Sequence, residues 1–98
     1  MRFRWDRYKA ADNRRKHRAS FEEACTIFSD ESILTVHDEK HSKQEDRWAS
    51  MGISVMGRVL VVIHTWPELD ESGDEIVRII SARRANERER ATYLERKR

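Results

Sequence analysis

The longest uninterrupted aliphatic run of the sequence, Val59-Leu60-Val61-Val62-Ile63, most constrains how this chain can fold. Both alternating sets of side chains are apolar here, so a strand over 59–66 has little surface to offer to water and is expected at the centre of a sheet. The run is far shorter than the ~20 residues that a membrane-spanning helix needs. A central strand requires a neighbour on each side, and the rest of the chain must supply them.

Further strand-like segments surround this run. Residues 33–36 and 47–55 precede it, and a turn at 56–58 that contains a glycine connects the second of them to the central strand. Residues 75–81 follow an acidic, turn-rich loop at 67–73. Consecutive strands with short connections favour an antiparallel meander.

Two helices are predicted near the N-terminus, after a short strand over 2–5 whose residues alternate polar and apolar. Asp6 is a suitable N-cap for a helix over 7–17, with Tyr8 and Ala11 on its inner face. The next segment, Ser20-Phe21-Glu22-Glu23, has the capping-box pattern, in which the serine caps a backbone N–H and the last glutamate reaches back. Apolar residues with helical spacing follow: Phe21, Ala24, Cys25 and Phe28.

The order of the elements predicts the fold class. With a helix over 86–97, rich in good helix formers, the chain has the order β-α-α-β-β-β-β-α. This order indicates an α+β fold in which one antiparallel sheet packs against two N-terminal helices and a C-terminal helix. Ninety-eight residues suffice for one modest core, so we expect a single domain over 1–98.

Cysteine and histidine usage indicates a reducing compartment and no metal. Cys25 is the one cysteine, so no internal disulfide forms, and its place on an apolar helix face favours a packed thiol over a nucleophile. His37 and His41 have a metal-ligand spacing, but their charged loop offers no further Cys or His ligand, so we expect no zinc site. The basic N-terminus lacks the apolar stretch of a secretory signal. We expect a cytoplasmic protein without a cofactor.

The net charge of +2 conceals a strong segregation of charge along the chain. Residues 1–18 carry eight Lys/Arg against two Asp/Glu, and residues 83–98 carry seven against three. Residues 19–46 carry two basic against eight acidic side chains. Two basic ends that meet in space would form the electropositive surface of a nucleic-acid binder, and two that stay apart would be solvated faces.

Four segments together carry a resemblance to a known family. They are WDRYKAADNRRKH, SFEEACTIF, EDRWASMG and IISARRANERERATYL, in that order. The ordered set resembles the BrnT toxins of bacterial type II toxin–antitoxin systems, nearly from end to end. The resemblance implies a RelE-like fold and a metal-independent ribonuclease that arrests translation. It also implies a cognate ribbon-helix-helix antitoxin of the BrnA kind, which neutralises the toxin and with it represses their operon.

The chain departs from the family pattern around the end of its first helix. The family usually has an aliphatic residue where this chain has Arg14, a glycine at Arg18 and a bulky aliphatic at Ala19. Because a side chain such as that of Arg18 tolerates a positive φ poorly, we expect a different backbone geometry after Lys16-His17. The additional arginines would strengthen a basic RNA surface.

Cleavage of RNA without a metal needs a base, an acid and cations around the phosphorane-like transition state. Arg83, in the matched ISAR motif where the last strand gives way to the final helix, is the first candidate, because a guanidinium donates two hydrogen bonds to phosphate and keeps its charge. The alternative interpretation is that Arg83 is one surface arginine among several and has no role in the reaction. Arg47, which precedes Trp48 in the matched EDRW segment, is either a second phosphate ligand or a partner of Glu45 or Asp46.

Three further residues keep two interpretations each. His17 is a candidate for proton transfer, because imidazole is the side-chain group suited to acid–base catalysis near neutral pH, but a histidine at a helix C-terminus also complements the helix dipole. Tyr93 either donates to phosphate or packs on the sheet. Trp48 either stacks on a base or belongs to the core. His64, in the central strand, is expected to be a satisfied core residue.

The predicted site therefore consists of two sets of residues. The catalytic set is Arg83, Arg47, His17 and Tyr93, and the RNA-binding set is Lys16, Arg15, Trp48, Arg84 and Arg88. The alternative function is a basic module that binds RNA or a protein without cutting. Convergence of the two arginines and a proton carrier on one patch would favour the nuclease. The acidic loops 37–46 and 67–75 are candidates for covering such a patch in cis.

Overall fold

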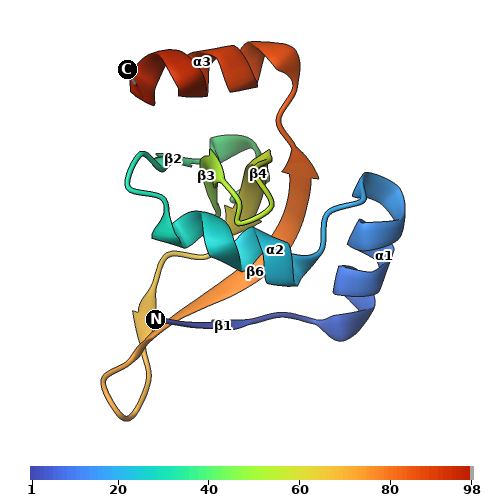
Figure 1. The fold of residues 1–98 in the computed structure, drawn as a ribbon. Helices are drawn as coiled ribbons and strands as arrows, with labels where there is room; N and C mark the ends of the chain where they lie inside the picture. Colours follow the sequence, from blue (N-terminus) through green and yellow to red (C-terminus); the bar gives the residue numbers. More distant parts are fainter. Residues whose placement is uncertain (98) are drawn as a thin grey trace.

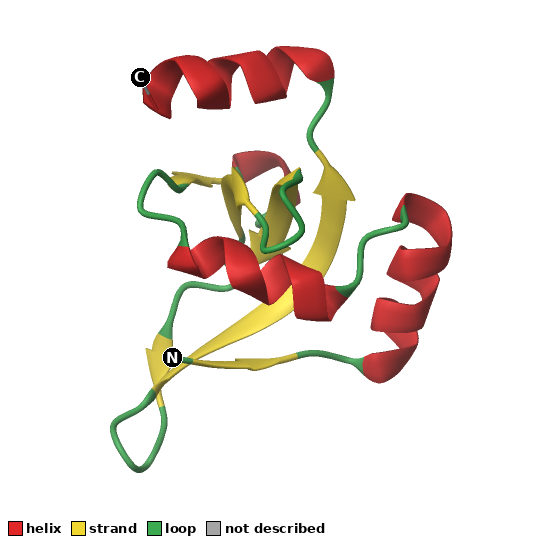
Figure 2. Cartoon of the chain, in the orientation of Figure 1, coloured by secondary structure: helices red, strands yellow, loops and turns green. Residues whose placement is uncertain are grey.

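The computed structural model describes residues 1–97, with the side chain of His41 excepted. The elements are β1 (Arg2–Arg4), α1 (Arg7–His17), α2 (Phe21–Thr26), β2 (Leu34–His37), β3 (Trp48–Ile53), β4 (Val59–His64), β5 (Glu68–Leu69), β6 (Glu75–Arg84) and α3 (Glu87–Lys97). Two 3-10 turns, η1 (Ile27–Ser29) and η2 (Glu39–His41), complete the order. The α+β class is confirmed, and most predicted boundaries lie within two residues of those observed (Figures 1 and 2).

The aliphatic run forms the central strand, as predicted. The strand order is β1-β6-β4-β3-β2, with β5 paired to β6 beside β4. Neighbours from β6 to β2 are antiparallel, but β1 pairs with β6 in parallel, so the sheet is mixed and the prediction of a purely antiparallel sheet is wrong. The short strand β5 lies in the segment that was predicted to be a loop.

The two faces of the sheet are covered unequally. On one face, α2 and η1 pack on alternate residues of β4 and β6 and form the larger core; its buried members are Ala19, Phe21, Ala24, Ile27, Leu60, Val62, Val77, Ile79 and Ala82. On the other face, a smaller cluster consists of Met51, Val59, Val61 and Tyr93. Figure 1 shows α2 lying across the sheet and α3 standing beyond the end of β6. Much of the second face is therefore left without a helix.

Helix α1 begins and ends where the sequence predicted, but its inner face differs. The Asp6 side chain accepts hydrogen bonds from the backbone N–H groups of Tyr8 and Lys9, so the predicted N-cap is confirmed. Tyr8 is 72% exposed and Ala11 is also exposed, whereas Asn13 is buried. The predicted inner face is wrong because α1 packs against the edge of β6, where a polar side chain is needed.

Asn13 takes the place of a neighbouring strand at that edge. Its Nδ2 donates to the carbonyl oxygens of Ala82 (2.8 Å) and Ala19 (3.0 Å), and its Oδ1 accepts from the Ala82 N–H (3.1 Å). The parallel strand β1 pairs with β6 only at residues 76–78. One amide side chain thus satisfies backbone groups that would otherwise be buried without partners.

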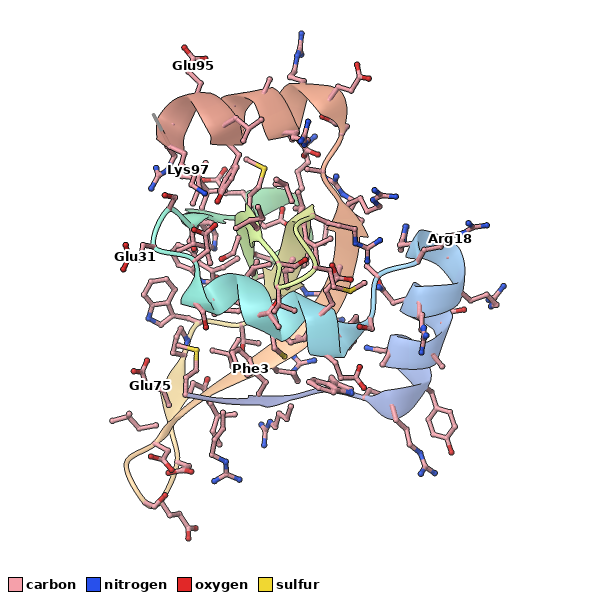
Figure 3. The ribbon with its side chains drawn as sticks, in the orientation of Figure 1. Phe3, Arg18, Glu31, Glu75, Glu95 and Lys97 are labelled. Carbon is pink, nitrogen blue, oxygen red and sulfur yellow. The ribbon has the colours of Figure 1, made fainter. Side chains whose placement is uncertain are left out.

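The helix end after His17 keeps the left-handed geometry that we expected to be lost. Arg18 has φ 54° and ψ 31°, and its N–H donates to the Arg14 carbonyl. Figure 3 shows Arg18 at the outer end of α1. The conformation is retained because the helix end and the following turn determine it, at the steric cost that a Cβ incurs there.

We expect Arg18→Gly to raise the free energy of unfolding by about 0.5–1 kcal/mol, because glycine removes the clash of the Cβ and gives back part of that gain as unfolded-state entropy. Urea unfolding at pH 7 measures the change. Arg18→Ala is the matched control, since it removes the same guanidinium and keeps the Cβ. Equal stabilities of the two variants would contradict the interpretation.

The predicted capping box of α2 is confirmed in one half only. Ser20 Oγ accepts from the Glu23 N–H at 3.0 Å. The Glu23 carboxylate does not reach back; it is buried and accepts hydrogen bonds from Ser54 and Arg58 in the β3–β4 turn.

Burial raises the pKa of the Cys25 thiol to about 11, in agreement with a packed cysteine.

Candidate functional site: the open face of the sheet

The register of β4 and β6 decides which side chains share a face. Arg83 pairs with Val61, and Arg84 pairs with Leu60, which belongs to the core under α2. Because β6 continues to Arg84, the two arginines project to opposite sides of the sheet. We call the side that carries Val61, Arg83, Ala49, Ile63 and Ser81, and that α3 covers only at one end, the open face.

Tyr93 attaches α3 to this end of the sheet. The residue is fully buried in the smaller cluster, and its hydroxyl donates to Asp30. Burial, followed by the hydrogen bond to Asp30, raises the pKa of Tyr93 to about 12. Of the two predicted roles, packing on the sheet is the one that this geometry supports.

Arg83 lies on the open face next to α3 and is oriented by Glu89. Its Nη1 and Nη2 donate to the two Glu89 carboxylate oxygens at 2.7 and 2.8 Å, a bidentate pair that holds the pKa of Glu89 below its usual range. Glu89 is itself fixed, because it accepts from the Asn86 N–H while Asn86 Oδ1 caps the Glu89 N–H. Within residues 1–97, no hydrogen bond occupies the Nε edge of the Arg83 guanidinium. That edge is available for two hydrogen bonds to a phosphate.

Arg47 occupies the other end of the open face. Met51 of β3 lies level with Val61 and Arg83, and Arg47 precedes Met51 by four residues, which places it ~13 Å farther along the sheet. Its partner there is Glu45, whose Oε1 is 3.9 Å from Arg47 Nε and also accepts from Arg78. The two predicted arginines thus share a face, but they do not converge on one phosphate.

Helix α1 forms the flank of the open face beside β6. Lys9, Lys16 and His17 line a hollow of about 200 Å³ together with Asp12, Asn13, Ile80 and Ser81 of the helix and strand. A β-bulge at Ile80 lies here, because His64 pairs with Ile79 while Ile63 pairs with Ser81. Ser81 is two residues from Arg83 on the same face, so the hollow that His17 lines lies on the same side of β6 as Arg83.

The other predicted RNA-binding residues are distributed more widely. Arg15 and Lys16 both pair with Asp12 on the surface of α1, and Arg88 is exposed on α3. Trp48 pairs in register with His64 and therefore faces the helix side, where its ring lies 4.5 Å from the Trp66 ring and 5.0 Å from the His37 ring, measured between centroids. Trp48 and Arg84 are thus on the opposite face from Arg83.

His64 is a satisfied core residue, in agreement with the prediction. Its Nδ1 lies 2.8 Å from the Thr65 carbonyl oxygen, so it donates there, and its Nε2 is 2.6 Å from Ser50 Oγ. Burial lowers the pKa of His64, which keeps the ring neutral. This serine–histidine pair is sealed between the sheet and Phe28 and has no access for a substrate.

Three residues of the candidate site were not considered from the sequence: Glu89, Arg78 and Lys9. Glu45 had been considered only as an alternative partner of Arg47, and the structure places it there. For Glu89 a signal existed, because Asn86 and Glu89 have the spacing of a capping box.

Among the described side chains, no three His, Cys, Asp or Glu residues are grouped as metal ligands would be. None of the helices described here has the length and apolarity required to cross a bilayer.

The fold and the open face define a small α+β domain with arginines and lysines placed along one exposed side of a sheet, an arrangement suited to a polyanionic ligand. Comparison with protein families gives a match over residues 5–89 to the model described as "Ribonuclease toxin, BrnT, of type II toxin-antitoxin system". The chain belongs to the BrnT family of ribonuclease toxins, whose members act on RNA and have a cognate antitoxin. A search of curated proteins finds no match.

Proposed function

We propose that this chain is a metal-independent endoribonuclease of RelE-like fold that inhibits translation and cleaves RNA on the open face. The free Nε edge of Arg83 is the observation that carries the proposal. Glu89 holds the guanidinium in one orientation, on the face of the sheet to which the hollow of His17 opens, and the remaining donors of the guanidinium are left for a phosphate. Arginine keeps its charge at any physiological pH, so it can supply the electrostatic stabilisation that a metal ion supplies in other nucleases.

The proposed reaction is an intramolecular transfer. The 2′-oxygen attacks the adjacent phosphorus while His17 accepts the 2′-hydroxyl proton, and the P–O5′ bond breaks. The products are a 2′,3′-cyclic phosphate and a 5′-hydroxyl that takes its proton from water. Arg83 stabilises the additional negative charge on the non-bridging oxygens. Tyr93 takes no part in this mechanism, because its hydroxyl is buried against Asp30.

The experiment that tests the proposal is cleavage of a structured RNA by the purified protein in excess chelator. We expect fragments that end in 2′,3′-cyclic phosphate. Mass spectrometry identifies these ends, and they resist ligation until the cyclic phosphate has been hydrolysed and removed. Cleavage that requires an added divalent ion would refute metal independence. Binding without cleavage under either condition would favour the alternative, a basic module that binds RNA without cutting it.

We also infer the nature of the partner from the family. The antitoxin is proposed to be a ribbon-helix-helix protein of the BrnA kind that covers the open face, forms an oligomeric complex with the toxin and binds the operator through its own domain. The toxin is proposed to act in the cytoplasm, where its RNA substrate is found.

A further inference from the structure

The loop between β2 and β3 places one carboxylate among three cations of the open face. Glu45 accepts a hydrogen bond from Arg78 Nη2, and its Oε1 lies 3.9 Å from Arg47 Nε. The hydrogen bond from Arg78, followed by the charges of Arg47 and Lys9, lowers the pKa of Glu45. Strand β6, the β2–β3 loop and helix α1 thus direct positive charge at a single point.

The Arg47 side chain has an unused donor at that point. Its Nε is buried, yet it makes no hydrogen bond with any described residue. A buried N–H without an acceptor is costly and suggests that a group is bound there in the functional state. The carboxylate of Glu45, with its Oε1 3.9 Å from Arg47 Nε, is too far for a hydrogen bond.

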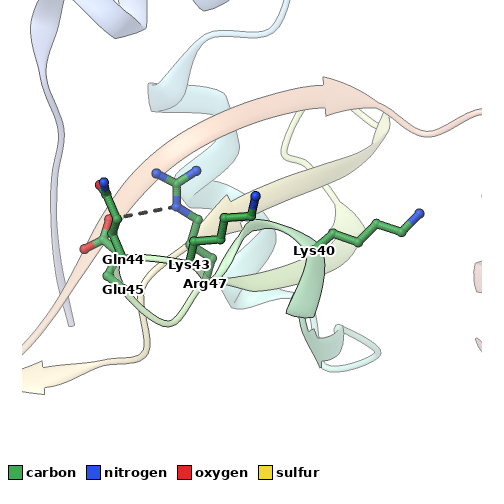
Figure 4. A pocket seen from close by; sticks show the side chains of 5 residues that line it. All are labelled: Lys40, Lys43, Gln44, Glu45 and Arg47. Carbon is green, nitrogen blue, oxygen red and sulfur yellow. Dashed lines mark ion pairs between the residues drawn. The ribbon is translucent and has the colours of Figure 1, made fainter.

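An open hollow adjoins this cluster and gives access to it. Its volume is about 590 Å³, and it is lined by Lys40, Lys43, Gln44, Glu45 and Arg47. Figure 4 shows these side chains on the segment between β2 and β3, with Arg47 paired with Glu45 and Lys40 set apart from the other four. Three of the five lining residues are cations, so the hollow can admit the backbone of a nucleic acid.

We propose that Arg47 and Arg78 form a second phosphate-binding subsite for the RNA backbone, and that Glu45 occupies it as a built-in substitute for phosphate in the free protein. The inference rests on the proposed function, since the RNA strand is the one that Arg83 binds. Arg47 lies ~13 Å along the sheet from the level of Arg83. The subsite therefore takes a flanking phosphate and not the one that is cleaved.

Glu45 is suited to leave the subsite when RNA binds. Its side chain is 39% exposed, so displacement returns the carboxylate to water and leaves no buried negative charge. An exposed ion pair contributes little to stability, and a phosphate offers several acceptors to the two arginines, including one for Arg47 Nε.

The test measures the affinity of a 5′-fluorescein single-stranded RNA 12-mer by anisotropy at several salt concentrations. The probe carries 2′-O-methyl groups throughout, which prevent attack by the 2′-oxygen and therefore cleavage. Glu45→Gln is expected to bind about tenfold tighter at low salt, equivalent to one charge-assisted contact. Its plot of log K against log salt should be steeper by ~0.7, the value for one additional phosphate contact on a single strand. Glu31→Gln, an exposed glutamate outside the open face, is the control and should match wild type.

The double variant Arg78→Ala/Glu45→Gln separates the subsite from a general charge effect. Tightening by Glu45→Gln should disappear when Arg78 is absent. The inference is overturned when Glu45→Gln binds like wild type, or when its gain persists without Arg78. Thermal unfolding of each variant verifies that the fold is intact.

The two proposals fail in distinguishable ways. Tighter binding by Glu45→Gln together with no cleavage by wild type would sustain the subsite and refute the nuclease. If cleavage depends on Arg83 but Glu45→Gln leaves the RNA affinity unchanged, the nuclease proposal is supported and the subsite proposal is refuted.

Discussion

Arg83→Ala is expected to reduce the rate of RNA cleavage by at least ~100-fold, the effect of removing one positioned donor from a developing anion. Arg84→Ala is the matched control, because Arg84 is adjacent in sequence, carries the same charge and projects from the other face of β6. Single-turnover cleavage in excess chelator, with enzyme above the dissociation constant, separates the chemical step from binding. We expect the Arg84 variant to retain wild-type activity within about twofold.

Arg83→Lys distinguishes a requirement for the guanidinium from a requirement for charge. Lysine keeps the positive charge but lacks the planar arrangement of donors, so it cannot hold Glu89 with one edge and phosphate with another. We expect most of the loss seen with alanine to remain. Equal losses in the Arg83 and Arg84 variants would show that arginine contributes only general charge, and the assignment of the reaction to the open face would then be wrong.

Asn13→Asp is expected to lower the free energy of unfolding at pH 7 by about 3 kcal/mol or more, because a buried carboxylate cannot donate to the Ala19 and Ala82 carbonyl oxygens and faces both of them. The substitution changes no volume, so the loss comes from hydrogen bonding and charge. Urea unfolding monitored by circular dichroism measures it.

Asp12→Asn is the control for this effect. It makes the reverse exchange, of a carboxylate for an amide, one residue earlier. There the carboxylate is about half exposed and pairs with Arg15 and Lys16 at the surface. We expect a change within about 0.5 kcal/mol. The two substitutions change the charge of α1 in opposite directions, so similar losses could not come from charge. They would mean that the pairing of Asn13 with the edge of β6 contributes no more than a surface side chain does.

The sequence predicted the helices and strands better than it predicted which of them lie next to one another. A run that is apolar on both faces had to be central, and Asp6 and Ser20 marked two helix starts, because these signals are local. The parallel pairing of β1 with β6 joins residues more than 70 positions apart, and alternation along a strand does not reveal which strand lies beside it. The inner face of α1 was missed for a related reason. A single asparagine that hydrogen-bonds to the edge of β6 produces no periodic pattern in the sequence.

The candidate site was predicted in part for similar reasons. Arg83 was found through its motif, and His17 lies on the flank of the same face. Arg84 and Trp48 were assigned to the site because they follow Arg83 and Arg47 in sequence, whereas consecutive strand residues point to opposite faces. The pairing of Glu89 with Arg83 and that of Glu45 with Arg78 were missed, since each depends on a helix or loop whose position only the folded chain defines.

The bulge at Ile80 has a consequence for how many points of contact one RNA strand can have. Arg78 and Arg83 are separated by five positions, an odd number, and in an unbroken strand an odd separation would direct them to opposite sides. The one inserted residue changes the parity, so that both arginines address the same side of the sheet. A family member that lacked this insertion, with both arginines retained, would have one of the two pointing away from the substrate.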